Sequence, residues 1–305
     1  MISSQWFDDL CVIANMSPEQ AATKLYEMGD EVSAEALEEV TDEKVTILSL
    51  GRPWPFQNRL WQHTAYTFGY IPPDIADNRD IPISSASNVS SDLSLKGRQI
   101  KVTLNALRVA SYPGSGTHQI LFDFYAQNVL PEATEHLHFN STYRVREGER
   151  AAILNYPIFL GINIGNDGLI LKCFTVNVKN EEDEQAIKFL ESDAFKAGLQ
   201  LATTVQPAIR PLSEMAVGLT KSIAKRRKNV AVQDIQIGLD FGNNPMGAQL
   251  AQGVYVAVQI PEALKRAWDW KDWVYDATTG QIVKDYGRDQ LIPYNYIAFG
   301  ISSYG

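Results

Sequence analysis

The chain has 305 residues, a formal net charge of -9 and a hydrophobic fraction of 45%. This composition is typical of a folded globular protein, and the length suits either one large domain or two smaller ones. Because the net charge is negative, the composition argues against bulk nucleic-acid binding, whereas a local basic patch can still bind an anion.

The cysteine content and the N-terminal residues both favour an intracellular protein. Cys11 and Cys173 lie far apart in the sequence and have no metal-ligand spacing. Asp8 and Asp9 stand where a signal peptide avoids acidic residues, and the apolar stretches are too short to span a bilayer. We therefore predict a cytoplasmic protein with reduced thiols.

Residues 1–45 are predicted to form an acidic helical segment. Ser17 is the expected N-cap of a first helix, because a proline follows it and Gln20 stands three residues after the cap. Gly29 can end this helix in a left-handed conformation, and Ser33 is the expected cap of a second helix. Short helices bury little surface, so these two must pack on another part of the protein or on a partner.

Residues 46–95 are predicted to be a connection that is rich in aromatic residues and proline and packs on the body of the protein. Pro53 and Pro55 disfavour both a central strand and a continuous helix. Aromatic side chains bury enough area to order such a segment. The aromatic residues here include Trp61, Tyr66, Phe68 and Tyr70.

Residues 96–305 show the alternation of apolar and polar residues that is typical of half-buried strands. Turn-forming residues separate the strands closely, which favours antiparallel neighbours. The predicted fold is mainly β (α+β), an antiparallel β-sandwich. The predicted strands are 99–110, 118–128, 135–146, 150–162, 168–178, 231–241, 253–260, 272–276, 280–284 and 294–303.

A helical insert is predicted at about 181–229, within the sandwich. Acidic residues from Glu181 to Glu184 suit the start of a helix, and helical spacing of apolar residues follows them. A second helix is expected from Leu212 to Lys225, ending in the basic run Lys225, Arg226, Arg227 and Lys228. Cations favour such a C-terminal position because of the helix dipole.

The succession of strands loosely resembles a C2-type sandwich, in which loop aspartates can hold calcium against a membrane. Asp269, Asp272 and Asp276 are loop carboxylates of the kind that the resemblance implies. No C2 loop motif is present, the helical insert departs from the pattern, and aspartate also favours ordinary turns.

His136 and His138 are the candidate metal ligands, because residues two apart on a strand share a face. Cupin-type metal sites begin with a similar pair. Their downstream glutamate is absent, since Thr142 and Tyr143 stand at about that position. The alternative interpretation is two histidines on the polar face of a strand.

Two further groups are candidate binding residues. The basic run from Lys225 to Lys228 suits phosphate, acidic lipid or an acidic partner, and also an internal contact with the acidic segment from Glu27 to Glu43. Trp268, Trp270 and Trp273 belong to the residue types found at binding hot spots. Their strand-like spacing predicts Trp268 and Trp270 on one face and Trp273 on the other.

No nucleophile elbow, phosphate loop or dinucleotide motif occurs in the sequence. We therefore predict a non-enzymatic recognition protein without a cofactor, such as an adaptor, a self-inhibited effector or an assembly subunit. Its predicted partner is another protein, and homo-oligomer formation is compatible with this function. The alternatives are a peripheral membrane-binding C2-like protein and a metal-dependent enzyme at His136 and His138.

Overall fold

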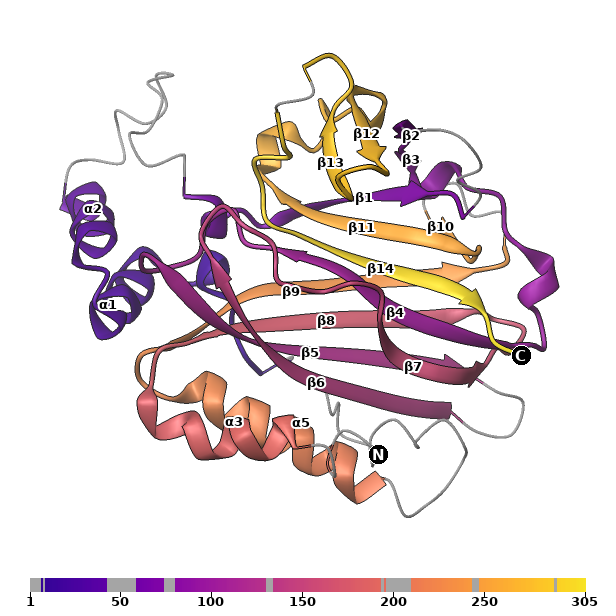
Figure 1. The fold of residues 1–305 in the computed structure, drawn as a ribbon. Coiled ribbons are helices and arrows are strands. Elements are labelled where there is room, and N and C mark those ends of the chain that lie inside the picture. Colours follow the sequence, from indigo (N-terminus) through magenta and orange to yellow (C-terminus); the bar gives the residue numbers. More distant parts are fainter. Residues whose placement is uncertain are drawn as a thin grey trace.

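The computed structural model describes residues 7, 9–42, 59–73, 80–129, 134–192, 195, 210–242, 247–287 and 290–305. Over these residues the chain forms an antiparallel β-sandwich with helical segments, which confirms the predicted fold class. Figure 1 shows two large sheets stacked face to face, a pair of helices below them and a small sheet above them. The narrower resemblance to C2-type sandwiches is not confirmed.

The larger sheet has six strands in the described part of the chain, and every pair in it is antiparallel. We call it the six-stranded sheet. In spatial order its strands are β3 (Ser84–Ser85), β1 (Ala65–Ile71), β11 (Gly253–Ile260), β14 (Tyr296–Ser303), β4 (Gln99–Arg108) and β7 (Tyr156–Asn163).

The facing sheet has five described strands, which are antiparallel except for the short parallel pair of β10 and β9. We call it the five-stranded sheet. In spatial order its strands are β10 (Ala248–Gln249), β9 (Asn229–Asp240), β8 (Leu169–Val178), β5 (Thr117–Val129) and β6 (Thr134–Arg146).

The main core lies between these two sheets, because alternate residues of each strand point to the facing sheet. Phe124 of β5 is fully buried and contacts Phe299 of β14, with ring centroids 5.6 Å apart. It also contacts Phe159 of β7, at 6.1 Å. Each such side chain stabilises the fold by about 1.5–3 kcal/mol through burial.

Two further layers cover the outer faces of the sheets (Figure 1). Helices α3 (Glu184–Glu191) and α5 (Arg210–Lys225) pack with Phe7 on the five-stranded sheet, where the Phe7 ring stacks on Phe174 at 4.5 Å. A small sheet of β13 (Gln281–Lys284), β12 (Trp273–Asp276) and β2 (Asp80–Pro82) covers part of the six-stranded sheet. The described 3-10 helices are Ile13–Asn15, Leu60–Gln62, Ala86–Asn88, Leu93–Leu95, Glu181–Asp183, Glu262–Leu264 and Trp270–Asp272.

Helices α1 (Pro18–Met28) and α2 (Glu31–Asp42) lie at one end of the sandwich and contribute to its main core. The predicted capping box is confirmed, because the Ser17 hydroxyl accepts from the Gln20 amide at 3.3 Å. Gly29 ends α1 with a φ of 78°. The predicted cap of α2 is wrong. The helix begins before Ser33, whose amide donates to the Asp30 carboxylate at 3.3 Å, and the Ser33 side chain is buried.

The sequence prediction missed β1, which lies inside the segment predicted to be a connection. Strand β1 pairs with β11 along its whole length, from Ala65 opposite Ile260 to Ile71 opposite Val254. Pro53 and Pro55 lie outside the described residues. The predicted division into residues 1–45, 46–95 and 96–305 stays a prediction, although the middle segment supplies strands to two sheets.

The predicted strand 150–162 begins later than expected, at Tyr156. Between Ala151 and Asn155 the chain forms a loop, and Asn155 has a φ of 49° that interrupts the extended backbone. This loop forms one wall of the candidate site described below.

A buried polar network occupies the α1–α2 end of the main core. The Tyr112 hydroxyl bonds to Thr175 at 3.0 Å and to Gln233 at 2.6 Å. His118 is fully buried beside Tyr112, and its Nδ1 lies 3.2 Å from the Asn177 amide nitrogen. Burial, together with the nearby charge of Lys179, lowers the pKa of His118 to about 4.

His118 is expected to make the protein less stable in mild acid. The folded state keeps the ring neutral, whereas the unfolded state takes up a proton below pH 6.5. The His118 contribution is therefore complete above pH 6.5 and falls as the pH drops toward 4, by about 3 kcal/mol in all. Urea unfolding of the wild type and of His118→Gln at several pH values measures this slope. Equal slopes for both proteins between pH 6.5 and 4 contradict the assignment.

Candidate functional site

Two adjoining cavities of about 590 and 560 Å³ lie on the outer face of the six-stranded sheet. They lie between the small sheet and the 150–155 loop, and we call them together the outer groove. Volumes of this size are typical of ligand sites. The two cavities share Asn105, Ala106, Arg150, Ile153 and Leu154.

The floor of the outer groove consists of small and polar residues on β4 and β14. Ala106 stands opposite Ala298, and Gly300 stands opposite Thr103. A Cβ atom at Gly300 would lie 2.6 Å from the Thr103 hydroxyl, so only glycine leaves this space open. The Thr103 hydroxyl donates to the Asn105 side-chain oxygen at 2.9 Å, which places hydrogen-bonding groups at the base of the groove.

The two walls of the outer groove come from different parts of the chain. On one side, the Leu154 side chain is 94% exposed and stands next to the left-handed Asn155. On the other side, Tyr275 and Ile282 come from β12 and β13. An exposed leucine on a wall of a groove is a surface that a partner can bury.

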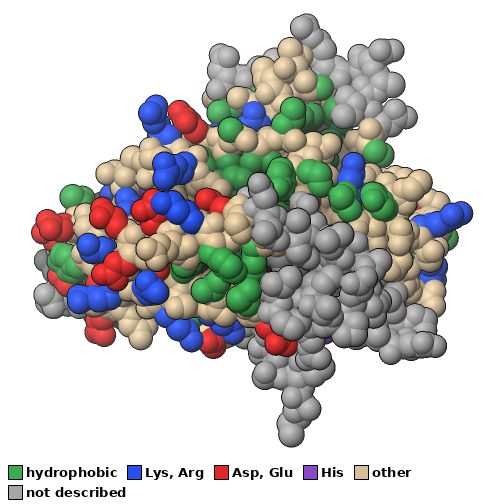
Figure 2. Space-filling view, turned by 60° about the horizontal axis from the view of Figure 1, so that its bottom comes forward, with side chains coloured by type: hydrophobic (Ala, Val, Ile, Leu, Met, Phe, Trp, Pro, Cys, Tyr) green, Lys and Arg blue, Asp and Glu red, His purple; other side chains and the backbone are tan. Residues whose placement is uncertain are grey.

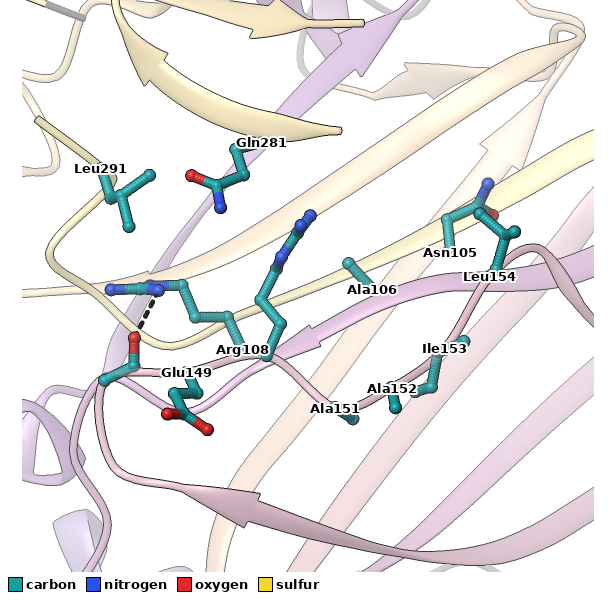
Figure 3. A pocket seen from close by; sticks show the side chains of 12 residues that line it. Asn105, Ala106, Arg108, Glu149, Ala151, Ala152, Ile153, Leu154, Gln281 and Leu291 are labelled. Atoms are coloured by element: carbon teal, nitrogen blue, oxygen red, sulfur yellow. Dashed lines mark hydrogen bonds between the residues drawn. The ribbon is translucent and has the colours of Figure 1, made fainter. Parts of the chain in front are cut away.

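Two arginines occupy one end of the outer groove. Arg108 and Arg150 form an antiparallel β-bridge, so their side chains leave the backbone on the same face. Arg108 is 8% exposed and donates from Nε to the Ile292 carbonyl at 3.1 Å and from Nη1 to the Gly148 carbonyl at 2.8 Å (Figure 3). Burial lowers the pKa of Arg108, Tyr296 opposes this shift, and the charge of Arg150 adds to it.

Arg150 is half-buried and bonds to the Gly280 carbonyl and to Tyr296. Tyr296 stands opposite Arg108 on β14, so all three side chains lie in one row across the sheet. The sequence analysis did not identify either arginine. A signal for Arg108 was present in the sequence, because a charged residue there interrupts the otherwise apolar end of a predicted strand.

The basic run at the end of α5 is largely paired with carboxylates of this chain. Lys225 contacts Asp9 at 2.7 Å, Arg226 contacts Asp183 at 2.7 Å, and Arg227 contacts Glu27 at 3.2 Å. Within the described residues, the structure records no ion pair for Lys228. Figure 2 shows basic and acidic side chains intermingled over the end of the molecule where α1 and α2 lie. Whether the run also binds a partner stays a prediction.

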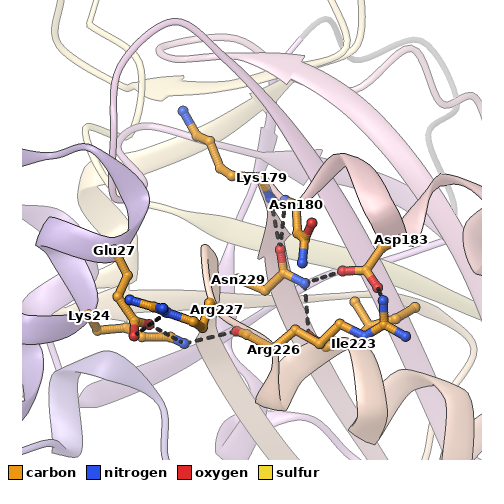
Figure 4. Close-up of polar contacts among 9 residues, drawn as sticks. All are labelled: Lys24, Glu27, Lys179, Asn180, Asp183, Ile223, Arg226, Arg227 and Asn229. Carbon is orange, nitrogen blue, oxygen red and sulfur yellow. Dashed lines mark hydrogen bonds and ion pairs between the residues drawn. The ribbon is translucent and has the colours of Figure 1, made fainter.

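Asp183 joins the two ends of the helical insert (Figure 4). Its carboxylate is fully buried, accepts a hydrogen bond from the Asn229 amide at 2.5 Å and forms an ion pair with Arg226 at 2.7 Å. Asn229 in turn accepts from the Lys179 and Asn180 amides, at 3.0 Å each. The predicted internal contact with the acidic segment is present at Glu27, which also lies 3.3 Å from Lys24.

The tryptophans are packed differently from the prediction. Trp268 stacks on Trp273 at 5.6 Å with an angle of 9° between the rings, so these two do not lie on opposite faces. The expected alternation fails because Trp270 begins a 3-10 helix instead of continuing a strand. Trp270 is buried, and its indole nitrogen donates to the Thr67 hydroxyl at 3.2 Å. Trp268 and Trp273 line a separate cavity of about 550 Å³.

His136 and His138 share one face of β6, because both rings lie against Tyr125. His136 is exposed, whereas His138 is buried with its Nδ1 3.5 Å from the Asp123 carboxylate. Asn140 donates to this carboxylate and, at 3.0 Å, to Thr220 of α5. Among the described residues, no three His, Cys, Asp or Glu side chains form a group that fits a metal ion. The metal hypothesis stays a prediction.

Two of the three loop carboxylates of the C2 resemblance act in turns, and the third, Asp272, ends a 3-10 helix. Asp269 accepts from the Lys271 amide at 2.9 Å, and Asp276 accepts from the Thr278 amide at 2.8 Å. The candidate groups from the sequence therefore lie in separate places. The histidines lie on the five-stranded sheet, the tryptophans lie over the six-stranded sheet, and the basic run begins with the last residue of α5.

No family model, curated protein or solved structure matches this chain. None of the helices in the described ranges has the length and apolarity that crossing a membrane requires.

Gly69→Ala is expected to destabilise the protein. Its Cβ would lie 2.8 Å from three atoms of the Trp270 ring, and this rigid, buried ring must then move. We expect a loss of about 1–3 kcal/mol in the free energy of unfolding. Chemical denaturation monitored by tryptophan fluorescence measures it. Gly218→Ala in α5 is the control, because its Cβ meets nothing within 4 Å and alanine favours a helix. Equal stability of Gly69→Ala and wild type contradicts the expectation.

Two lysines of α5, Lys221 and Lys225, are expected to control the titration of Asp9. Hydrogen bonds from Lys221 and Lys225 lower the pKa of Asp9 to about 2 from the usual 3.8. In the double variant Lys221→Gln, Lys225→Gln this pKa should return toward 3.8, as carboxyl NMR titration can measure. Lys188→Gln, which removes an ion pair with Glu184 elsewhere, should leave Asp9 unchanged. A normal Asp9 pKa in the wild type contradicts the contact.

Proposed function

We propose that this protein is a non-enzymatic recognition protein that binds a segment of another protein in the outer groove. The observation that carries the proposal is the groove itself, which combines hydrogen-bonding side chains on its floor with an exposed leucine on its wall. Such a combination serves binding, since the polar groups orient a ligand and the apolar wall supplies burial energy.

The shape of the outer groove favours an extended peptide as the ligand. It crosses β4 and β14, and its lining includes the polar side chains of Lys101, Asn105 and Ser302, which can bond to main-chain groups of a peptide. The Leu154 side chain can pack on an apolar side chain of the peptide. We further propose a cytoplasmic location, which the two free cysteines support.

The position of α1 and α2 is consistent with an adaptor or a self-inhibited effector. Leu25 and Leu37 are buried in the main core, so apolar packing holds these helices. The ion pair between the half-buried Glu27 and the exposed Arg227 adds little energy and mainly fixes the orientation of these helices. A partner that competes for this pair can therefore act on the orientation without opening the core.

The proposal predicts that binding of the partner depends on Leu154. Leu154→Glu places a charge on the groove wall and should weaken binding about tenfold or more, the size of a hot-spot effect. Leu93→Glu is the matched control, because Leu93 is 63% exposed and lies outside the groove. Proteins captured by the wild type and by Leu93→Glu but lost with Leu154→Glu are then purified and titrated calorimetrically against all three chains.

The proposal is overturned if no captured protein is lost with Leu154→Glu, or if every purified partner binds the wild type and Leu154→Glu with equal affinity. Circular dichroism and thermal unfolding of the three chains show whether the substitutions leave the fold unchanged. Both leucines are largely exposed, so neither substitution should alter stability by more than about 0.5 kcal/mol.

A further inference from the structure

The arginine bridge places two cationic side chains at neighbouring positions of the sheet, and within the described part of the chain neither is paired with a carboxylate. Like charges directly opposite each other across two strands are destabilising. Among the described residues, no ion pair involves Arg108 or Arg150. The lining contains one described carboxylate, Glu149, which faces Arg146 at 3.8 Å. Figure 3 shows the Glu149 carboxylate and the Arg108 guanidinium pointing in different directions.

Both arginines bond to neutral groups, and these bonds leave N–H donors of Arg108 for a ligand. Arg108 uses Nε and Nη1 for two backbone carbonyls, and within the described chain no bond is recorded for its Nη2. A guanidinium has five N–H donors in a fixed fork, which matches the oxygens of a phosphate or carboxylate. The carbonyls hold Arg108 in place, so its remaining donors need no reorganisation when they bind an anion.

Small residues leave room for such an anion beside the arginines. This cavity has a volume of about 560 Å³, and four of its lining residues are glycine or alanine. These residues are Ala106, Gly148, Ala151 and Ala152. The Arg108 end of the groove is therefore open, polar and positively charged, although the whole chain carries a net charge of -9.

We infer that Arg108 and Arg150 bind the phosphate group of a phosphorylated side chain in the partner segment. This inference rests on the proposed function and names the chemistry of its ligand. A phosphate monoester carries close to two negative charges at pH 7 and compensates both guanidiniums. A carboxylate carries one charge and leaves the second guanidinium uncompensated. Arginine clusters recognise phosphorylated motifs in this way.

The first test uses O-phosphoserine and inorganic phosphate as probes of the whole chain. NMR spectra of the arginine side chains should show saturable shifts of the Arg108 and Arg150 Nε signals with both probes. Glutamate should need an about tenfold higher concentration, because it makes fewer charge-assisted hydrogen bonds. Binding should weaken below about pH 6, where phosphate loses its second charge. No saturable shift at either arginine overturns the inference.

Variants distinguish a specific anion site from general attraction of an anion to positive charge. Ala152→Glu adds a carboxylate at the edge of the cavity without removing Arg108, and should weaken phosphoserine binding about tenfold. Arg98→Gln removes an exposed arginine outside the cavity and should have no effect. Arg150→Gln serves as a second variant if Ala152→Glu fails to fold. Equal weakening by Arg98→Gln and Ala152→Glu overturns the inference.

Further measurements identify the source of the phosphate and separate this inference from the proposed function. Binding to vesicles that contain phosphoinositides, without binding of phosphoserine, overturns the peptide source. If Leu154→Glu loses the partner but the wild type binds no phosphate, the groove remains a recognition site and only the phosphate inference is refuted. If the arginines bind phosphate but no partner depends on Leu154, the anion site stands and the proposed function is refuted.

Discussion

Burial on both faces of the five-stranded sheet is the constraint on which the rest of the structure depends. Its inner face supplies Phe122 and Phe124 to the main core, while its outer face carries Leu121, Phe174 and Val176. A sheet that is apolar on both faces cannot leave one of them in water. The helical insert and Phe7 are therefore structural cover, and the charges at the end of α5 hold that cover in place.

The six-stranded sheet needs a covering layer over only part of its outer face. The outer groove lies over the part that needs none. On β11 the outer residues Val256, Val258 and Ile260 are apolar, and the small sheet and Trp270 cover them. On β4 and β14 the outer residues include Thr103 and Gly300, which need no cover. The sequence of each strand thus decides where the second layer is needed and where the face stays open.

The strands of the body were predictable because apolar alternation is a local signal, whereas the groove was not. Residues 253–260 were predicted as a strand at the observed bounds, but β1 was missed because nearby prolines outweighed its aromatic alternation. Arg150 comes from a different segment of the chain than Arg108, so only the β-bridge between them shows that the two arginines are neighbours. The contact of the basic run with Glu27 was predicted from the segregation of charge, whereas Asp9 and Asp183 reach the run from two other segments that local composition does not indicate.

The acidity of the whole chain and the positive charge of the groove have separate effects on the proposed phosphorylated ligand. Charges separated by more than about 10 Å are largely screened at physiological ionic strength, so most of the net charge of -9 has little effect on the bound anion. Overall repulsion lowers the encounter rate with an anionic partner, whereas the arginine bridge governs how long the partner stays. Such a protein discriminates by the contacts in the site, because long-range attraction does not bring acidic molecules to it indiscriminately.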